Sequence, residues 1–175
     1  AKFGLHNKAK ELLNEVISIQ KKLINSDPNS INIKLEFAKS LNNLAIIYQE
    51  QGDYEQAKQL YEQTLEIRQK ALPAKNLDIA ATLDNLANSY RGLKNYEMAE
   101  LFNKQAVAIR KELLLDNHPD IAKSLNNLAI IYQDQGDYEQ AKPLHDEALA
   151  IRQEALPTNH PDVGRSYGNL ALVYK

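Results

Sequence analysis

A period of 42 residues runs through this chain, and it constrains the fold more than any other feature. The block Leu-Asn-Asn-Leu-Ala fills residues 41–45 and recurs at residues 125–129. Variants of the block lie in phase with it at residues 83–87 and 167–171. Such a period predicts stacked supersecondary units in place of a single closed core.

Each unit has the pattern of two helices joined by a tight turn. Leu41, Leu44, Ala45 and Tyr48 recur at the spacing of one helical face. Glycine adopts the left-handed conformation that ends many helices, so Gly52 predicts the end of the first helix. Asp53 follows it as a helix N-cap, and Gln56 lies three residues further on, as in a capping box. The second helix is expected to end near residues 72–73.

The same pattern predicts two further helix pairs, at about 78–93 with 95–114 and at about 119–134 with 137–155. The segments 117–120 and 159–162 both read Asn-His-Pro-Asp, with Pro at the first helical turn and Asp beside the positive end of the helix dipole. His118 and His160 lie one period apart, so we expect them to cap helices or pack loops.

The period divides the chain into repeats at residues 30–74, 75–116 and 117–158. Residues 1–29 match the second helix of a preceding repeat, followed by a linker six residues longer than the others, around residues 25–32. Residues 159–175 match the first helix of a truncated repeat. Because terminal repeats normally carry a polar outer face, we expect a fragment of a longer array. The alternative is a final helix that serves as a natural cap.

Three positions depart from the repeat pattern. Lys94 replaces the turn glycine, so Lys94 and Asn95 must form that turn. Asn103 and His145 replace Tyr61, and we expect those two sites to be more hydrated. Pro143 lies inside a predicted helix, where it removes one backbone hydrogen bond and is expected to kink the helix.

Composition excludes several classes of site. The chain has no Cys, which excludes disulfides and thiolate metal sites and favours an intracellular protein, so we expect the cytoplasm. A net charge of −2 gives no reason to expect nucleic acid or an anionic membrane as partner. Its apolar runs are too short to span a bilayer.

Catalytic and cofactor motifs are absent from the sequence. His118 and His160 fall in separate repeats and not around one metal ion. Ser and Thr lack a His/Asp arrangement that would make a nucleophile. The six Gly are scattered, so no phosphate-binding loop exists. We therefore expect no enzyme, no metal and no cofactor.

The pattern resembles the tetratricopeptide repeat. Residues Tyr48, Gly52, Tyr54, Ala57 and Tyr61 follow that family's spacing across its helix–turn–helix, although Leu41 stands where the family often has Trp. The 42-residue length, the Leu-Asn-Asn-Leu-Ala block and the Ala-Leu-Ala-Ile-Arg of residues 148–152 look like the kinesin light chain subtype. The resemblance covers nearly the whole chain. It implies an all-α fold, a right-handed superhelical solenoid of antiparallel helix pairs, and peptide binding.

In this family the first helix of each pair lines the concave groove of the superhelix. The stripe beside the core stripe of that helix is then free to face the groove. Four Asn share one position in this stripe and would form a row of carboxamides able to donate to and accept from a peptide backbone. The resemblance points the same way, because kinesin light chain repeats use groove Asn to hold extended peptides. The candidate groove residues are Asn43, Asn85, Asn127, Asn169, Lys39, Lys123, Arg165, Ile46, Asn88 and Ile130.

Other interpretations of these residues stay open. The Asn row could bridge neighbouring helices, or it could be a remnant of duplication. Lys39, Lys123 and Arg165 form a basic edge that favours acidic peptides, but a solvated row of charges gives the same pattern. The leading hypothesis is a scaffold that binds an extended peptide of a protein partner. The alternatives are a spacer whose truncated terminal repeats stack end to end, and the sensor or docking part of a larger multidomain protein.

Overall fold

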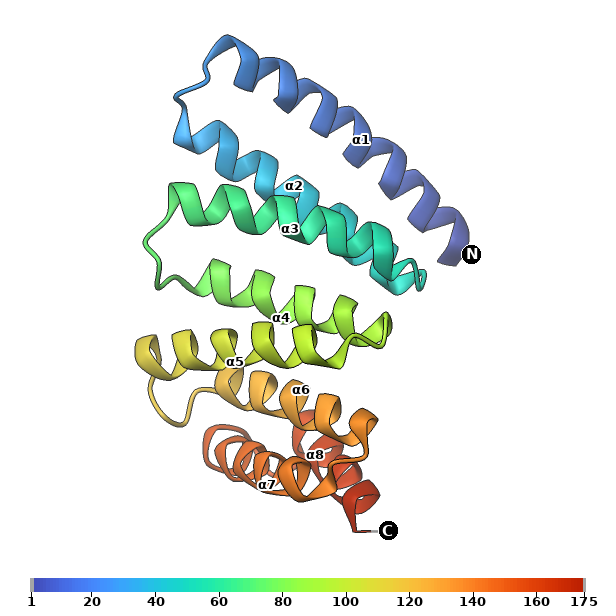
Figure 1. The fold of residues 1–175 in the computed structure, drawn as a ribbon, viewed down its shortest axis with the longest axis vertical. Coiled ribbons are helices and arrows are strands. Elements are labelled where there is room, and N and C mark those ends of the chain that lie inside the picture. Colours follow the sequence, from blue (N-terminus) through green and yellow to red (C-terminus); the bar gives the residue numbers. More distant parts are fainter. Residues whose placement is uncertain (1, 175) are drawn as a thin grey trace.

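The protein is an open stack of eight α-helices in the part of the chain that its computed structural model describes, which is the backbone of residues 2–174 and the side chains of residues 6–174. Figure 1 shows the helices following one another down the stack in chain order from α1, with α7 and α8 together at the other end. The helices are α1 (Lys2–Ser26), α2 (Ile31–Glu50), α3 (Tyr54–Ala71), α4 (Leu77–Gly92), α5 (Tyr96–Leu113), α6 (Pro119–Gln135), α7 (Tyr138–Ala155) and α8 (Pro161–Val173).

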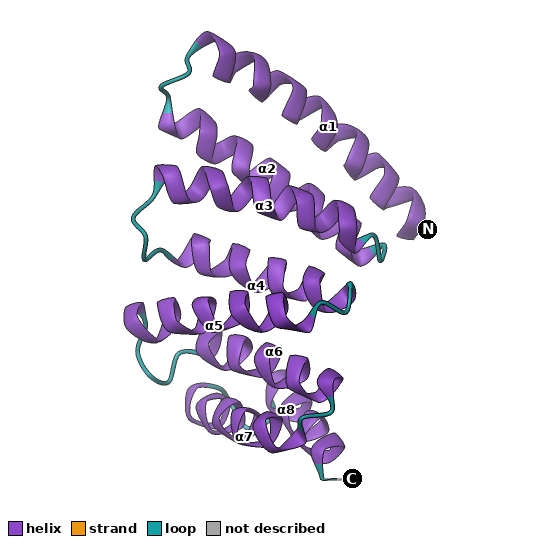
Figure 2. Cartoon of the chain, in the orientation of Figure 1, coloured by secondary structure: helices purple, strands orange, loops and turns teal. Residues whose placement is uncertain are grey.

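The helices pack as antiparallel neighbours joined by short loops (Figure 2). The most extensive contacts are those of α2 with α3, α4 with α5 and α6 with α7. Smaller contacts join α3 to α4, α5 to α6 and α7 to α8, and α4 also touches α2 and α6. The expected all-α solenoid of helix pairs is therefore confirmed. The division into repeats at 30–74, 75–116 and 117–158 stays a prediction.

Small residues allow the helices to approach closely. Alanines at equivalent positions of successive helices are fully buried, and larger apolar side chains fill the space between them. Leu83 and Leu86 of α4 pack in the same core cluster as Tyr61 of α3. The fully buried alanines are Ala38, Ala45, Ala57, Ala80, Ala87, Ala99, Ala106, Ala122, Ala129, Ala141 and Ala148.

Side chains cap the helices where the sequence predicts it. Asp53 accepts a hydrogen bond from the backbone N–H of Gln56 at 3.2 Å, which satisfies one of the free donors at the start of α3. His118 and His160 cap α6 and α8, each through Nδ1, which accepts from the N–H two residues further on at 3.1 Å. The expectation that these histidines cap helices is confirmed.

The tight turns within the helix pairs require a left-handed residue. Gly52 and Gly136 adopt φ angles of 80° and 81°, as expected for glycine at a helix end. Lys94 occupies the equivalent position in the second repeat with φ of 59°. The turn between α4 and α5 therefore forms at residues 94–95 as predicted, although Lys94 has a Cβ that this region disfavours.

The expected long linker after the first helix is wrong. The loop between α1 and α2 has four residues, 27–30, whereas the loop between α3 and α4 has five, 72–76. The extra residues instead lengthen both helices. Asn76 caps α4, and the 42-residue period would place the corresponding cap of α2 at position 34. The cap is instead Ser30, so α2 begins about one turn earlier.

The expected hydration of two core sites is also wrong. Asn103 and His145 are 0% and 1% exposed, so both are shut off from solvent. Each has an internal polar partner, because Asn103 donates to Asp84 and His145 pairs with Gln133. Pro143 lies on the exposed side of α7, and the helix continues past it to Ala155. None of the described helices is long and apolar enough to cross a membrane.

The strained turn gives a prediction about stability. Replacing Lys94 with Gly should raise the free energy of unfolding by about 0.5–1 kcal/mol. A side chain at positive φ costs roughly 1–2 kcal/mol, and the greater conformational freedom of glycine in the unfolded chain offsets part of that gain. Urea denaturation measures the change. Leu93→Gly is the matched control, because Leu93 lies in the same turn at φ of −82°. A larger gain from Leu93→Gly than from Lys94→Gly would contradict this account.

Candidate binding face

The first helices of the pairs, α2, α4, α6 and α8, form one surface of the stack, which we call the first-helix face. The predicted groove residues lie along it with unequal exposure. Asn43, Ile46, Lys39, Lys123 and Arg165 are exposed. The others are half-buried, namely Asn85, Asn88, Asn127, Ile130 and Asn169. Their role in binding stays a prediction.

Three pockets open between neighbouring first helices. The pocket between α2 and α4 has a volume of about 270 Å³ and contains Lys39 and Arg68. A pocket of about 320 Å³ between α6 and α8 contains Lys123, Asn127 and Arg165. Beside it lies a third pocket of about 420 Å³ that includes Ile130 and Asn169. The first-helix face is therefore hollowed next to six of the ten predicted groove residues.

The Asn row is not uniform in its contacts. Asn169 of α8 donates through Nδ2 to Oδ1 of Asn126 on α6, at 2.6 Å. That member bridges two helices, which was one of the alternatives for the whole row. Among the described residues, the carboxamides of Asn43, Asn85 and Asn127 have no such bond. These three carry free donors and acceptors on the first-helix face.

The basic edge is partly neutralised by the chain itself. Lys39 pairs with Glu36 at 2.6 Å, and Arg165 pairs with Asp162 at 3.2 Å. The Lys39–Glu36 pair is exposed, and in the Arg165–Asp162 pair the arginine is exposed and the aspartate half-buried, so each pair adds little to stability. Lys123 has no ion pair among the described residues. The positive charge available to a partner is thus concentrated at the α6–α8 end of the face.

Below this face runs a row of buried arginines that the sequence analysis did not identify as functional. Arg68, Arg110 and Arg152 lie one period apart in the second helices and are 7%, 4% and 4% exposed. Each donates to a hydroxyl on the first helix of the next pair: Arg68 to Thr82 at 2.6 Å, Arg110 to Ser124, and Arg152 to Ser166 at 2.5 Å. The row therefore links each pair to the next.

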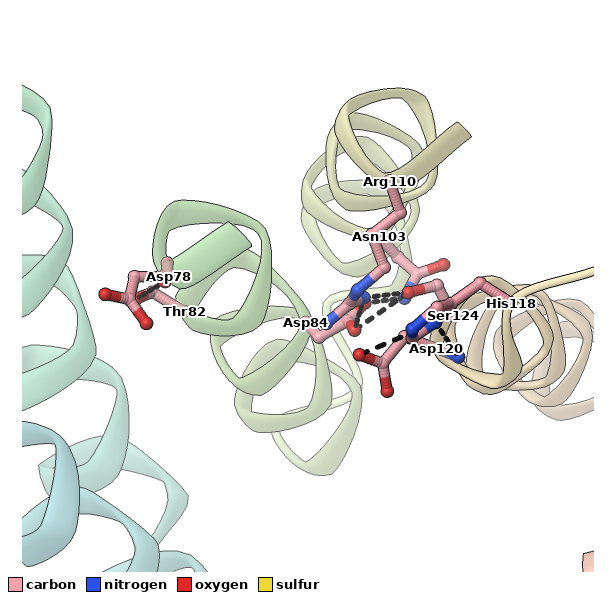
Figure 3. A network of polar contacts seen from close by, with 8 residues as sticks. All are labelled: Asp78, Thr82, Asp84, Asn103, Arg110, His118, Asp120 and Ser124. Atoms are coloured by element: carbon pink, nitrogen blue, oxygen red, sulfur yellow. Dashed lines mark hydrogen bonds and ion pairs between the residues drawn. The ribbon is translucent and has the colours of Figure 1, made fainter. Parts of the chain in front are cut away.

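Among the described residues, the middle arginine alone of the three has a buried carboxylate partner. Figure 3 shows Asp84 of α4 meeting Arg110, Asn103 and Ser124 between α4, α5 and α6. Asn103 donates to Asp84 Oδ1 at 2.8 Å, and Ser124 donates to Oδ2 at 2.9 Å. Burial raises the pKa of the Asp84 carboxyl, while Arg110, Ser124 and the more distant Lys123 act in the opposite direction.

Two sequence signals could have revealed this row. The first signal is that Arg68, Arg110 and Arg152 recur at the 42-residue period. An exposed residue with no structural role would be free to differ between repeats. Asp84 is the one acidic residue at a position that is otherwise Asn42, Asn126 and Gly168. A sequence alone does not show that the two sets meet, because they lie on different helices.

A buried histidine completes the polar interior. His145 Nε2 lies 2.9 Å from Gln133 Oε1, and Nδ1 has no hydrogen-bond partner in the part of the chain that the structure describes. Burial and, to a smaller extent, the nearby Arg152 lower the pKa of His145 to about 4, and Asp146 acts in the opposite direction. His145 is therefore neutral at physiological pH. In the described part of the chain, no three His, Cys, Asp or Glu side chains are placed to hold a metal ion.

Comparison with known proteins relates the chain to repeat proteins. The family described as Tetratricopeptide repeat matches residues 36–112 and 120–175. No curated protein sequence matches the chain.

Solved structures give the same relation. A putative kinesin light chain from Podosopora anserina with nearly identical TPR-like repeats is 30% identical, with a TM-score of 0.78, over 99% of this chain and 79% of that one. BtubC (BKLC) from P. vanneervenii has a TM-score of 0.77 at 24% identity, over 97% of this chain and 65% of that one. The chain thus spans less than two thirds of BtubC. MamA has a TM-score of 0.62 at 17% identity, over 95% of this chain and 80% of that one, and shares the fold alone.

The histidine gives a prediction about acid stability. The pKa of His145 is about 4 in the folded chain and about 6.5 in the unfolded chain. At pH values between the two, the histidine binds a proton in the unfolded state but not in the folded state, so the free energy of unfolding falls as the pH falls. From pH 6 to pH 5 the free energy of unfolding should drop by about 1 kcal/mol more in the wild type than in His145→Tyr, which carries the residue of position 61. Urea denaturation across this window measures it. Parallel pH profiles for the two proteins would contradict the assignment.

Proposed function

Because the chain belongs to the tetratricopeptide repeat family and is of the kinesin light chain-like type, we propose that it binds an extended peptide segment of a protein partner on the first-helix face. Repeats of this family generally mediate protein–protein interaction. The observation that carries the finer proposal is the set of unpaired carboxamides at Asn43, Asn85 and Asn127 among the described residues, of which Asn127 lines an open pocket. An extended peptide exposes its backbone N–H and C=O groups, which carboxamides can satisfy without requiring a particular side chain.

Apolar side chains beside the row would add affinity and register. Ile46 is 37% exposed on α2, and Ile130 lines the pocket between α6 and α8 with Leu172. The side chains of an extended peptide alternate in direction. Every second side chain would therefore contact these apolar residues, while the peptide backbone meets the carboxamides. The surface then needs no cofactor, and we propose a non-enzymatic scaffold, expected in the cytoplasm.

The peptide proposal predicts the effect of removing two carboxamides. Asn43→Ala with Asn127→Ala should weaken the best peptide from a library by about tenfold, since two neutral hydrogen bonds contribute roughly 0.5–1.5 kcal/mol each. Fluorescence polarisation measures the affinity. Asn14→Ala with Asn29→Ala is the matched control, because both residues are exposed and lie off the first-helix face. Identical peptide profiles for the two double variants would refute the carboxamide row.

Exposed apolar residues at both ends favour a second candidate, end-to-end stacking of copies through the terminal repeats. Leu12, Ile19 and Leu23 of α1 are about half exposed, as are Tyr167 and Leu172 of α8. In a solenoid such faces are usually covered by the next unit. The same faces would serve further repeats if this segment were the sensor or docking part of a larger protein.

Stacking predicts a mass that grows with protein concentration in light scattering. Ile19→Lys should suppress the growth, because a charge would then be buried in the apolar end contact. Ser18→Lys is the matched control, one residue away on the same exposed helix. A monomeric mass at all concentrations would reject the stacking of copies through their terminal helices. Peptide binding on the first-helix face would then remain as the proposed function.

A further inference from the structure

A fourth pocket lies at the end of the stack that holds α1 (Figure 1). It has a volume of about 320 Å³ and lies where the end of α1, the start of α2 and the end of α3 meet. None of its lining residues is a predicted groove residue or lines one of the three pockets of the first-helix face. Apolar side chains form its walls, namely those of Ile24, Ile31, Phe37, Ile67 and Ala71.

The extra turn at the start of α2 contributes one of these walls. Ile31 lies in that turn and is 54% exposed, whereas Phe37 is buried. Small-molecule sites in proteins are concave, mainly apolar and about 300–1,000 Å³ in volume, with a few polar groups that orient the ligand. The pocket therefore has the size and the lining of a site for a small apolar ligand.

Two lysines complete the lining and give the pocket its charge. Lys34 is half-buried and has no ion pair among the described residues. Lys70 pairs with Glu66 of its own helix at 2.6 Å, in an exposed pair of the kind that contributes little to stability, so a ligand can compete for it. No lining residue is acidic. The pocket thus combines apolar walls with an excess of positive charge.

The later repeats do not have this charge. Where the first repeat has the pocket lysine of α3, they have Glu112 and Glu154. A side chain of the preceding loop binds each glutamate: Lys75 pairs with Glu112, and Asn117 donates to Glu154 at 3.4 Å. The corresponding residue of the first repeat is Ile33, which has no polar side chain. The later junctions are therefore closed by an internal polar contact that the first junction cannot form.

We propose that this pocket binds a small aliphatic carboxylate, with its hydrocarbon chain against the apolar walls and its carboxylate between Lys34 and Lys70. Hydrogen bonds between an ammonium and a carboxylate are charge-assisted and stronger than neutral ones. A pocket at the lower end of the size range of ligand sites suits a short chain with a head group as small as a carboxylate. The site is separate from the first-helix face, so it does not depend on peptide binding there.

The test is a titration with octanoate and hexanoate at constant ionic strength, followed by NMR of the isoleucine methyl groups. Octanoate should shift the signals of Ile24, Ile31 and Ile67 to saturation, with a Kd on the order of 0.1–1 mM. Hexanoate should bind about tenfold more weakly, because two fewer CH₂ groups are buried. The uncharged 1-hexanol should bind at least about threefold more weakly than hexanoate, since it cannot pair with the lysines.

Ile19 is the internal control, because it is exposed on α1 and lies outside the pocket. Its signal should stay unchanged while that of Ile24 saturates. Shifts that grow linearly, a response of Ile19 equal to that of Ile24, or equal affinities for hexanoate and 1-hexanol would each overturn the proposal.

A double variant tests the two lysines. Lys34→Asn with Lys70→Glu introduces the residues of positions 76 and 112, so the protein is expected to fold. It should weaken octanoate binding by about tenfold or more, as for the loss of charge-assisted bonds, and leave 1-hexanol binding unchanged. The matched control is Lys21→Asn with Lys22→Glu, which makes the same change in charge at exposed positions of α1 outside the pocket. Undiminished octanoate binding to the first variant, or an equal loss in the control, would also reject the site.

Discussion

Each junction between successive helix pairs contains the same buried polar interaction, the hydrogen bond from an arginine in the second helix to a hydroxyl in the first helix of the next pair. Arg68, Arg110 and Arg152 all make it. An open stack has no distant contacts to hold its shape, so each junction must be fixed locally. A charged hydrogen bond in a buried setting also has strict geometry, which sets the angle at which one pair meets the next.

The same interaction explains why polar chemistry gathers under the first-helix face. Guanidinium groups that bridge two pairs must reach past the alanine-rich contacts into the space between first helices. Burial lowers the pKa of the Arg152 guanidinium, and Asp162 opposes that effect while Arg165 adds to it. A junction that stabilises the stack therefore also places positive charge at the bottom of a surface pocket.

The sequence predicts the fold well because its signals are local and repeated. The end of one helix at Gly52 and the starts of others at Asp53 and at His118 depend on residues only a few positions apart. The same signals recur one or two periods away, which strengthens each prediction. The errors concern partners on other helices. Asn103 suggested a hydrated site because nothing in its own helix shows that Asp84 will meet it. Likewise the extra residues near position 27 lengthen two helices, since Ser30 caps earlier than the repeat frame suggests.

For the candidate site, the sequence predicts which residues share a face but not which are free. Asn43 and Asn169 occupy the same repeat position, yet Asn169 is bonded to Asn126. Lys39 and Lys123 are likewise equivalent, and only Lys39 has an ion pair among the described residues. The position of a residue in the repeat determines the direction in which its side chain points. The contacts of a polar side chain depend on neighbouring residues, which the period does not repeat.

That dependence limits how far the repeats are interchangeable. Residues 39–58 and 123–142 differ only in Glu50 and Asp134, yet they face different surroundings on the two sides of the middle repeat. A segment copied from one place in the array to the other would keep its helices and caps while meeting a different set of charges. Duplication in such a chain multiplies the scaffold, and the order in which the copies are arranged gives each one its own chemistry.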